Sequence, residues 1–210
     1  MATELVLVRH GETVWNTESR IQGHSDSPLT ALGLEQADAI AARLAGERFD
    51  ALLSSDLGRA RETAMAIAGR TGHRAIEDPR LRERNFGVGE GLTYGELDYQ
   101  YPDVFSRVRE TDPDFRIPSG ESRRQFHARV VSAFTSVAEA HDGKRIVVVT
   151  HGGVLAILYR HVHGLGIATP HAIPIVNASY NVLSFESGAF RLLCWGDTAH
   201  LGGTDAFEEP

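Results

Sequence analysis

Two histidines in this sequence each follow a short apolar run and each precede a glycine. The first is His10 in LVLVRHGET, and the second is His151 in IVVVTHGG. Arg9 stands directly before His10, and Arg59 lies in the first turn of a predicted helix after a third run that ends near Ser54. Arginine binds phosphate oxygens bidentately, and a neutral histidine nitrogen can attack phosphorus. If the three runs are neighbouring strands, the sequence predicts a site for a phosphoryl group.

The elements that would position these side chains alternate between strands and helices. Apolar runs predict strands at 4–8, 50–54 and 145–150, and helical periodicity predicts helices at about 31–46, 57–70, 122–141 and 153–163. Thr30 is expected to cap the first of these helices, with an apolar stripe of Leu34, Ala37, Ala41 and Leu44. Ligands bind beyond the carboxyl ends of strands in such sheets. We expect an α/β three-layer sandwich with a mostly parallel central sheet flanked by helices.

The rest of the chain fits one domain over 1–210. Residues 72–93 are rich in glycine and read as loop, and the polar, aromatic stretch at about 93–120 suggests a short insertion with small helices. Two terminal strands at about 181–186 and 190–195 read as a hairpin, and a frayed tail is expected from about 202.

Composition narrows the class of partner. The net charge of −7 disfavours nucleic acid, and no apolar run approaches the ~18 residues that a membrane span needs. A small phosphorylated metabolite needs only a local cluster of positive groups. Cys194 is the single cysteine, so a reducing, cytoplasmic location is expected.

Other uses of the same residue types fit less well. Zinc usually takes three or four ligands, and Cys194 and the His161-x-His163 pair do not assemble such a set, so no metal site is expected. The segment GVGEG at 87–91 lacks the lysine and spacing of a nucleotide-binding loop, and no cofactor is expected. Either histidine alone would more often be structural.

LVRHGET resembles the signature of the histidine phosphatase superfamily, also called the phosphoglycerate mutase-like family. Further segments resemble that family in the same order along the chain: SSDLGRARETA at 54–64, LRERNFGVGEG at 81–91, PSGES at 118–122 and VTHGG at 149–153. The resemblance covers nearly the whole chain and implies the phosphoglycerate mutase-like fold.

The resemblance also implies roles for individual residues. His10 would be the nucleophile that becomes phosphorylated, and Arg9, Arg59 and His151 would clamp the transferring group. Glu83 would protonate the leaving oxygen and then activate water; Glu90 is a nearby competitor, but the spacing favours Glu83. Asn16, Gln22 and Gly23 in NTESRIQG match positions where related phosphatases add neutral hydrogen bonds to the phosphate, and with Gly152 of VTHGG they complete the implied phosphate-binding set.

Two branches of the family share the first half of this chemistry. Family mutases carry a longer insertion with adjacent arginines and tend to have Asn where this chain has Gly153, whereas Arg123-Arg124 here follow PSGES on a predicted helix. We therefore predict a phosphomonoesterase for small phosphorylated metabolites. One alternative is a cofactor-dependent phosphoglycerate mutase. A second is a non-catalytic phosphate-binding protein of the same fold, which is less favoured because such a protein would be expected to lack one of the catalytic groups. All five are present here: Arg9, His10, Arg59, Glu83 and His151.

The sequence also gives expectations for the surroundings of the site. Residues 93–120 and the loop after 163, with His171 and Asn177, are expected at the mouth of the site. Aromatic residues of the insertion are candidates for an apolar wall there, although such residues more often form the small core of the insertion itself: Tyr94, Tyr99, Tyr101, Phe105 and Phe115. A homodimer is possible, because dimers occur in the family and the apolar terminal hairpin could supply an edge.

Overall fold

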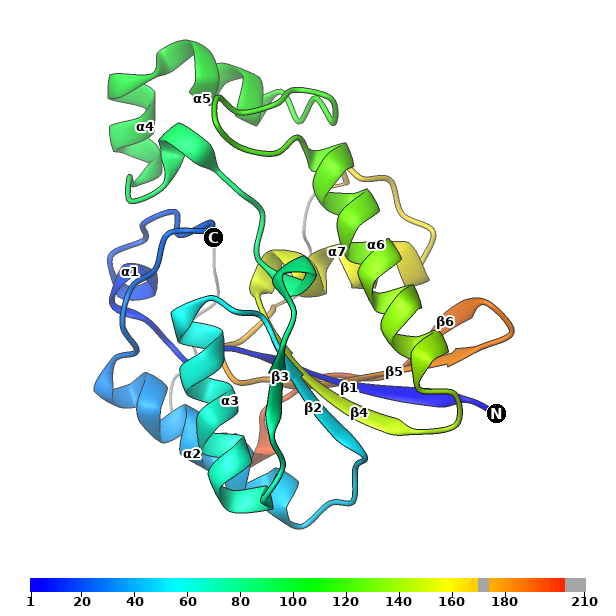
Figure 1. Ribbon diagram of the computed structural model, residues 1–210. Helices are drawn as coiled ribbons and strands as arrows, with labels where there is room; N and C mark the ends of the chain where they lie inside the picture. Colours follow the sequence, from blue (N-terminus) through cyan, green and yellow to red (C-terminus); the bar gives the residue numbers. More distant parts are fainter. Residues whose placement is uncertain (170–173, 203–210) are drawn as a thin grey trace.

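A mixed six-stranded sheet forms the centre of the protein in a computed structural model that describes residues 1–169 and 174–202 (Figure 1). The strand order is β3-β2-β4-β1-β5-β6. The first four of these are parallel neighbours, whereas β5 runs antiparallel to β1 and β6 antiparallel to β5. The strands are β1 (Thr3–Arg9), β2 (Ala51–Ser54), β3 (Ala75–Glu77), β4 (Arg145–Thr150), β5 (Tyr180–Glu186) and β6 (Ala189–Asp197).

Helices cover both faces of this sheet, which confirms the expected α/β sandwich. They are α1 (Val14–Thr17), α2 (Ala31–Ala45), α3 (Gly58–Thr71), α4 (Tyr94–Gln100), α5 (Pro102–Arg109), α6 (Arg123–Ala140) and α7 (Gly152–Val162), with short 3₁₀ turns η1 (Pro79–Leu81), η2 (Gly87–Gly89) and η3 (Ala199–Leu201). No helix in the described ranges has both the length and the apolar character that crossing a membrane requires.

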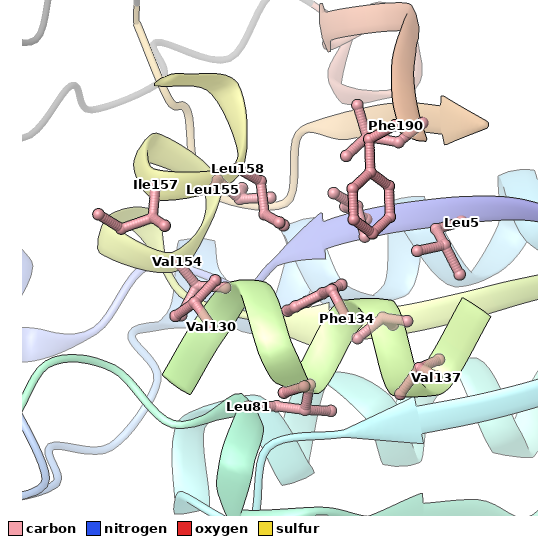
Figure 2. Close-up of a cluster of buried hydrophobic side chains, with 14 of the residues drawn as sticks. Leu5, Leu81, Val130, Phe134, Val137, Val154, Leu155, Ile157, Leu158 and Phe190 are labelled. Atoms are coloured by element: carbon pink, nitrogen blue, oxygen red, sulfur yellow. The ribbon is translucent and has the colours of Figure 1, made fainter. Parts of the chain in front are cut away.

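Alternate residues of each strand enter two separate hydrophobic clusters, because successive side chains of a strand point to opposite faces. On one face, Leu5 and Leu7 of β1 pack with α6 and α7, where Phe134 is fully buried (Figure 2). On the other face, Val6 and Val8 pack with α2 and α3. β1 and β4 are buried on both faces, so close packing holds the backbone at their carboxyl ends.

The cap signals in the sequence are confirmed, but the apolar stripe of α2 is wrong at one position. Thr30 accepts a hydrogen bond from the backbone of α2, and Ser122 and Gln125 form the reciprocal capping box at the start of α6. Leu34 is 49% exposed, because the buried side of α2 is formed by Ala37, Ile40, Ala41 and Leu44 together with Gln36.

The stretch predicted as loop at 72–93 contains a strand. β3 pairs with β2 at the sheet edge over three residues, and Ile76 there is 54% exposed. A half-exposed edge strand this short has no apolar run to signal it. The terminal hairpin is confirmed with slightly longer strands, β5 and β6. The tail expected from about 202 falls largely on residues 203–210, outside the described ranges.

The insertion folds as α4 and α5, which lie beyond the end of the sheet in Figure 1. Thr93 and Glu96 form a capping box at the start of α4. Arg20 fixes this helix to the N-terminal segment, since its guanidinium donates to the Glu96 carboxylate at 2.6 Å and to the Gly91 carbonyl at 2.8 Å. The insertion is therefore anchored beside the segment that follows β1 and α1.

Candidate active site

The three strand ends that the sequence analysis singled out lie side by side. The His10 backbone N–H donates to the Thr150 carbonyl at 3.0 Å, and the Ser55 N–H donates to the Val149 carbonyl at 2.9 Å, so β1 and β2 flank β4. The imidazole rings of His10 and His151 lie 5.3 Å apart between centroids. The predicted convergence of the two histidines is confirmed.

Two buried arginines complete this end of the sheet. Arg9 is fully buried at the end of β1, and its guanidinium donates to the Ile175 carbonyl. Arg59 is 1% exposed in the first turn of α3. Its guanidinium donates to the carbonyls of Gly23 and Ser25, both at 2.9 Å, and to the Asp26 carboxylate at 3.1 Å. The loop at 23–26 therefore fixes the direction of the second cation.

His10 is neutral and presents one defined nitrogen. Burial, and then the positive charges of Arg59 and Arg9, hold the pKa of His10 well below its usual range. The Nδ1 atom lies 2.7 Å from the Gly11 carbonyl oxygen. A carbonyl can only accept, so Nδ1 carries the single proton of the neutral ring and Nε2 keeps its lone pair. This is the form of histidine that can act as a nucleophile.

Of the two carboxylates that competed in the sequence, only Glu83 lines the cavity beside His10. Its oxygens accept the Gly153 N–H at 2.8 Å and the Arg84 N–H at 2.7 Å. Glu90 instead holds the chain together. It accepts the backbone N–H groups of His24, Ser25 and Phe86, at 2.8 to 3.0 Å.

The residues expected to bind phosphate are brought together to different degrees. Asn16, Gln22 and Gly23 line the cavity, and the Gln22 Oε1 atom is buried without a hydrogen-bond partner among the described residues. His151 is fully buried, and neither it nor Gly152 lines the cavity; Gly153 takes that place.

The cavity has a volume of about 380 Å³. Its floor is formed by Arg9, His10 and Arg59, and its walls include Trp15, Arg20, Ile21 and Phe86, which the sequence analysis missed. Trp15 and Ile21 precede Asn16 and Gln22 directly, so their positions could have been inferred from that segment.

The apolar wall predicted from the insertion is largely wrong. Tyr94 lines the cavity, but Tyr99 is 90% exposed and the other three aromatic residues do not reach it. Trp15 and Phe86 supply the aromatic surface instead. Asn177 lines the cavity as expected and donates to the His10 carbonyl at 3.0 Å, whereas His171 lies outside the described residues.

The arrangement suits an anion chemically. Two arginines, a neutral imidazole nitrogen and amide groups face one small space, and buried cations attract a phosphoryl group far more strongly there than in water. A carboxylate on the wall can exchange a proton with a leaving oxygen or with water. Among the described residues, no group of three or more His, Cys, Asp or Glu side chains is placed to hold a metal ion.

Comparison with known proteins assigns the chain to a family. The sequence profile of the histidine phosphatase superfamily (branch 1) matches residues 5–198. The chain belongs to this superfamily. Among its relatives, the metal-independent phosphoserine phosphatase of Arabidopsis thaliana is 42% identical over 202 residues, which cover 95% of this chain and 83% of the relative.

The chain is similar both to proteins named as phosphatases and to proteins named after phosphoglycerate mutase. The phosphoglycerate mutase-like protein 4 of Arabidopsis thaliana is 40% identical over 208 residues, covering 96% of this chain and 88% of that protein. A mycobacterial glucosyl-3-phosphoglycerate phosphatase, solved with VO3, superposes with a TM-score of 0.80 at 34% identity over 93% of this chain and 99% of that one.

Proposed function

We propose that the protein is a phosphomonoesterase that hydrolyses small phosphorylated metabolites through a phosphohistidine on His10. The observation that carries this proposal is the shared cavity of His10, Arg9, Arg59 and Glu83. Membership of the histidine phosphatase superfamily and the phosphatase names among its relatives support it.

The proposed reaction has two steps at one phosphorus atom. The His10 Nε2 lone pair forms a P–N bond as the P–O bond to the leaving group breaks, and Glu83 gives a proton to the departing oxygen. Glu83 then takes a proton from water, whose oxygen attacks the phosphohistidine and releases phosphate. Arg9, Arg59, His151, Asn16 and Gln22 would stabilise the charge on the equatorial oxygens.

Hydrolysis is favoured over phosphoryl return to a bound phosphoglycerate. Arg124, one of the two adjacent arginines, is engaged in a fork with the Asp114 carboxylate at 2.5 and 2.9 Å. Gly153 packs against Glu83 with no room for a side chain. A larger residue at this position would displace the Glu83 carboxyl, so glycine suits a site in which Glu83 serves the attacking water, and both observations support the phosphatase branch.

The part of the cavity wall that would face the organic part of the substrate favours an uncharged group. Trp15, Ile21, Phe86 and Tyr94 give it an apolar surface. Arg20, the remaining cation of the lining, is already paired with Glu18 at 2.8 Å and with Glu96 at 2.6 Å. Because a paired guanidinium has little to offer a substrate carboxylate, we expect neutral esters to be used better than phosphoserine or 3-phosphoglycerate.

The assay that tests the function supplies 3-phosphoglycerate and a trace of the 2,3-bisphosphate in the presence of EDTA. We expect phosphate to be released faster than 2-phosphoglycerate forms, and p-nitrophenyl phosphate to be turned over as well. Rapid isomerisation with negligible phosphate release would make the protein a mutase. Loss of turnover on chelation, restored by a divalent ion, would contradict a site whose positive charge comes from arginine.

The proposal extends to the location and assembly of the protein. We take residues 1–210 as a single domain. A cytoplasmic location is consistent with Cys194, which is half-buried and is the single cysteine of the sequence. The edge strand β6 carries Leu193, which is 56% exposed, and it is the surface through which a homodimer would form. Sedimentation would show the dimer.

A further inference from the structure

The Ser55 hydroxyl contacts one nitrogen of the buried His151 imidazole. The Ser55 Oγ lies 2.8 Å from the His151 Nε2, and both residues are fully buried. Ser55 lies at the end of β2 and His151 at the end of β4, so the contact is held by paired strands. The other ring nitrogen, Nδ1, is buried and has no hydrogen-bond partner among the described residues.

The direction of this hydrogen bond follows from what else Ser55 does. The Ser55 Oγ accepts the Leu57 backbone N–H at 3.3 Å, and among the described residues the His151 Nε2 is the one acceptor within reach of its own buried proton, which would otherwise be unsatisfied. Burial, and then the charges of Arg59, His10 and Arg9, hold the pKa of His151 well below its usual range, so the ring is neutral and carries one proton. If Ser55 donates to Nε2, that proton is on Nδ1.

We propose that Ser55 is a positioning residue that fixes the Nδ1–H tautomer of His151. The ring of His151 lies behind the cavity lining with its centroid 5.3 Å from that of His10, and its Nδ1–H would donate to an oxygen of the phosphoryl group that His10 receives. The proposal rests on the phosphatase function for the identity of that acceptor. The other tautomer would aim a lone pair at the phosphoryl oxygens and repel them. Ser55 therefore acts on the reaction only through the imidazole.

The tautomer can be observed directly by ¹⁵N NMR of the histidine-labelled protein, with the His151 signals assigned by their loss in His151→Asn. We expect a protonated Nδ1 and an unprotonated Nε2 in the ligand-free enzyme, and a shift of the Nδ1–H signal when vanadate is added. A protonated Nε2 would overturn the proposal. This measurement needs no turnover, so it separates failure of the tautomer from failure of the proposed function.

Ser55→Ala tests the consequence, and Ser54→Ala is its matched control. Ser54 is equally buried next to it, but its hydroxyl donates to the Ser55 carbonyl at 2.8 Å and does not contact His151. We expect Ser55→Ala to show both tautomers and to lose roughly ten-fold in kcat/KM for p-nitrophenyl phosphate, the size of one hydrogen bond. Ser54→Ala should keep the single tautomer.

If Ser55 acts only through His151, the effects of Ser55→Ala and His151→Ala on kcat/KM must not add. In a His151→Ala background, Ser55→Ala should cost nothing further in kcat/KM, because the group it acts through is gone. An unchanged tautomer and rate in Ser55→Ala, or equal losses with and without His151, would contradict the assignment.

Discussion

At the scale of single residues, Gly153 determines where the Glu83 carboxyl lies. Its N–H holds one carboxyl oxygen at 2.8 Å, and a Cβ at this position would come within 2.2 Å of the other. The clash is with the end of a flexible side chain and not with backbone. A residue larger than glycine would therefore leave α7 intact and push Glu83 away from its place.

We expect Gly153→Ala to fold normally and to lose activity selectively. Turnover of sugar phosphates, whose leaving oxygen needs a proton, should fall by about 10- to 100-fold, a share of the ~10²–10⁴-fold that general acid catalysis typically supplies. Turnover of p-nitrophenyl phosphate should change little. Steady-state kinetics on both substrates measures the difference.

Two variants control for this effect. Gly69→Ala adds the same methyl group to α3 where nothing lies within 4 Å, and it should leave both rates unchanged. In a Glu83→Gln background, Gly153→Ala should have no further effect on the sugar phosphates. Equal losses on the two substrates would mean that Gly153 does not act through Glu83.

Residue types and order in the sequence predicted the floor of the cavity and the polar part of its wall, but not its apolar part. Arg9, His10 and Arg59 follow from strand and helix ends, because chain direction alone brings those ends to one edge of the sheet. Trp15 lies in the four-residue helix α1 and Phe86 in a loop, and neither segment is long enough to show an apolar periodicity. The role of Asp26 was also missed, because its partner Arg59 is distant in sequence.

At the scale of elements, the loop at 23–26 and the start of α3 form one unit through Asp26. Its carboxylate accepts the Gly58 backbone N–H at the helix N-terminus and pairs with Arg59 at 3.1 Å. Gly23 has a positive φ of 57°, and a Cβ there would meet Glu90 at 2.2 Å. The loop is thereby fixed between α3 and Glu90.

Asp26→Ala should release Arg59 as well as a helix end. We expect vanadate to inhibit the variant less well, and the free energy of unfolding to fall by about 1 kcal/mol for the lost cap. Asp38→Ala, which removes the exposed ion pair with Arg70 at the other end of α3, should leave vanadate inhibition unchanged. If vanadate inhibited Asp26→Ala as strongly as Asp38→Ala, Asp26 would have no part in holding Arg59 at the site.

Helices and strands were predicted correctly wherever the sequence shows a complete apolar run or a helical apolar periodicity. The strands of the site are buried on both faces and therefore read as continuous apolar runs, as in β4. The pattern failed where tertiary contacts decide burial, as at Leu34, and where an edge strand is too short to show a pattern, as in β3.

At the scale of the whole molecule, buried histidines make stability depend on pH. The pKa values of His10, His24, His127, His151 and His200 are all lowered, in each case chiefly by burial. The unfolded chain binds protons at these positions below pH about 6.5, where the fully buried rings of the folded protein stay neutral. Stability must therefore fall as the pH falls through that value.

Urea unfolding at pH 7.5 and 5.5 measures this dependence. We expect a lower free energy of unfolding at pH 5.5, with each fully buried histidine contributing up to about 1.4 kcal/mol per pH unit. His151→Gln should flatten the pH dependence by its share, whatever its effect at pH 7.5. A pH dependence identical to that of the unsubstituted protein would show that His151 is not neutral in the folded state.

The measurement that tests the central claim most directly is the mapping of the covalent intermediate. The enzyme would be mixed with ³²P-labelled substrate and quenched in denaturant at high pH, because the P–N bond is labile in acid. The account predicts label on the peptide that contains His10, absent from the His151 peptide, and loss of both label and turnover in His10→Ala. Label on His151, or near-normal turnover in His10→Ala, would contradict it.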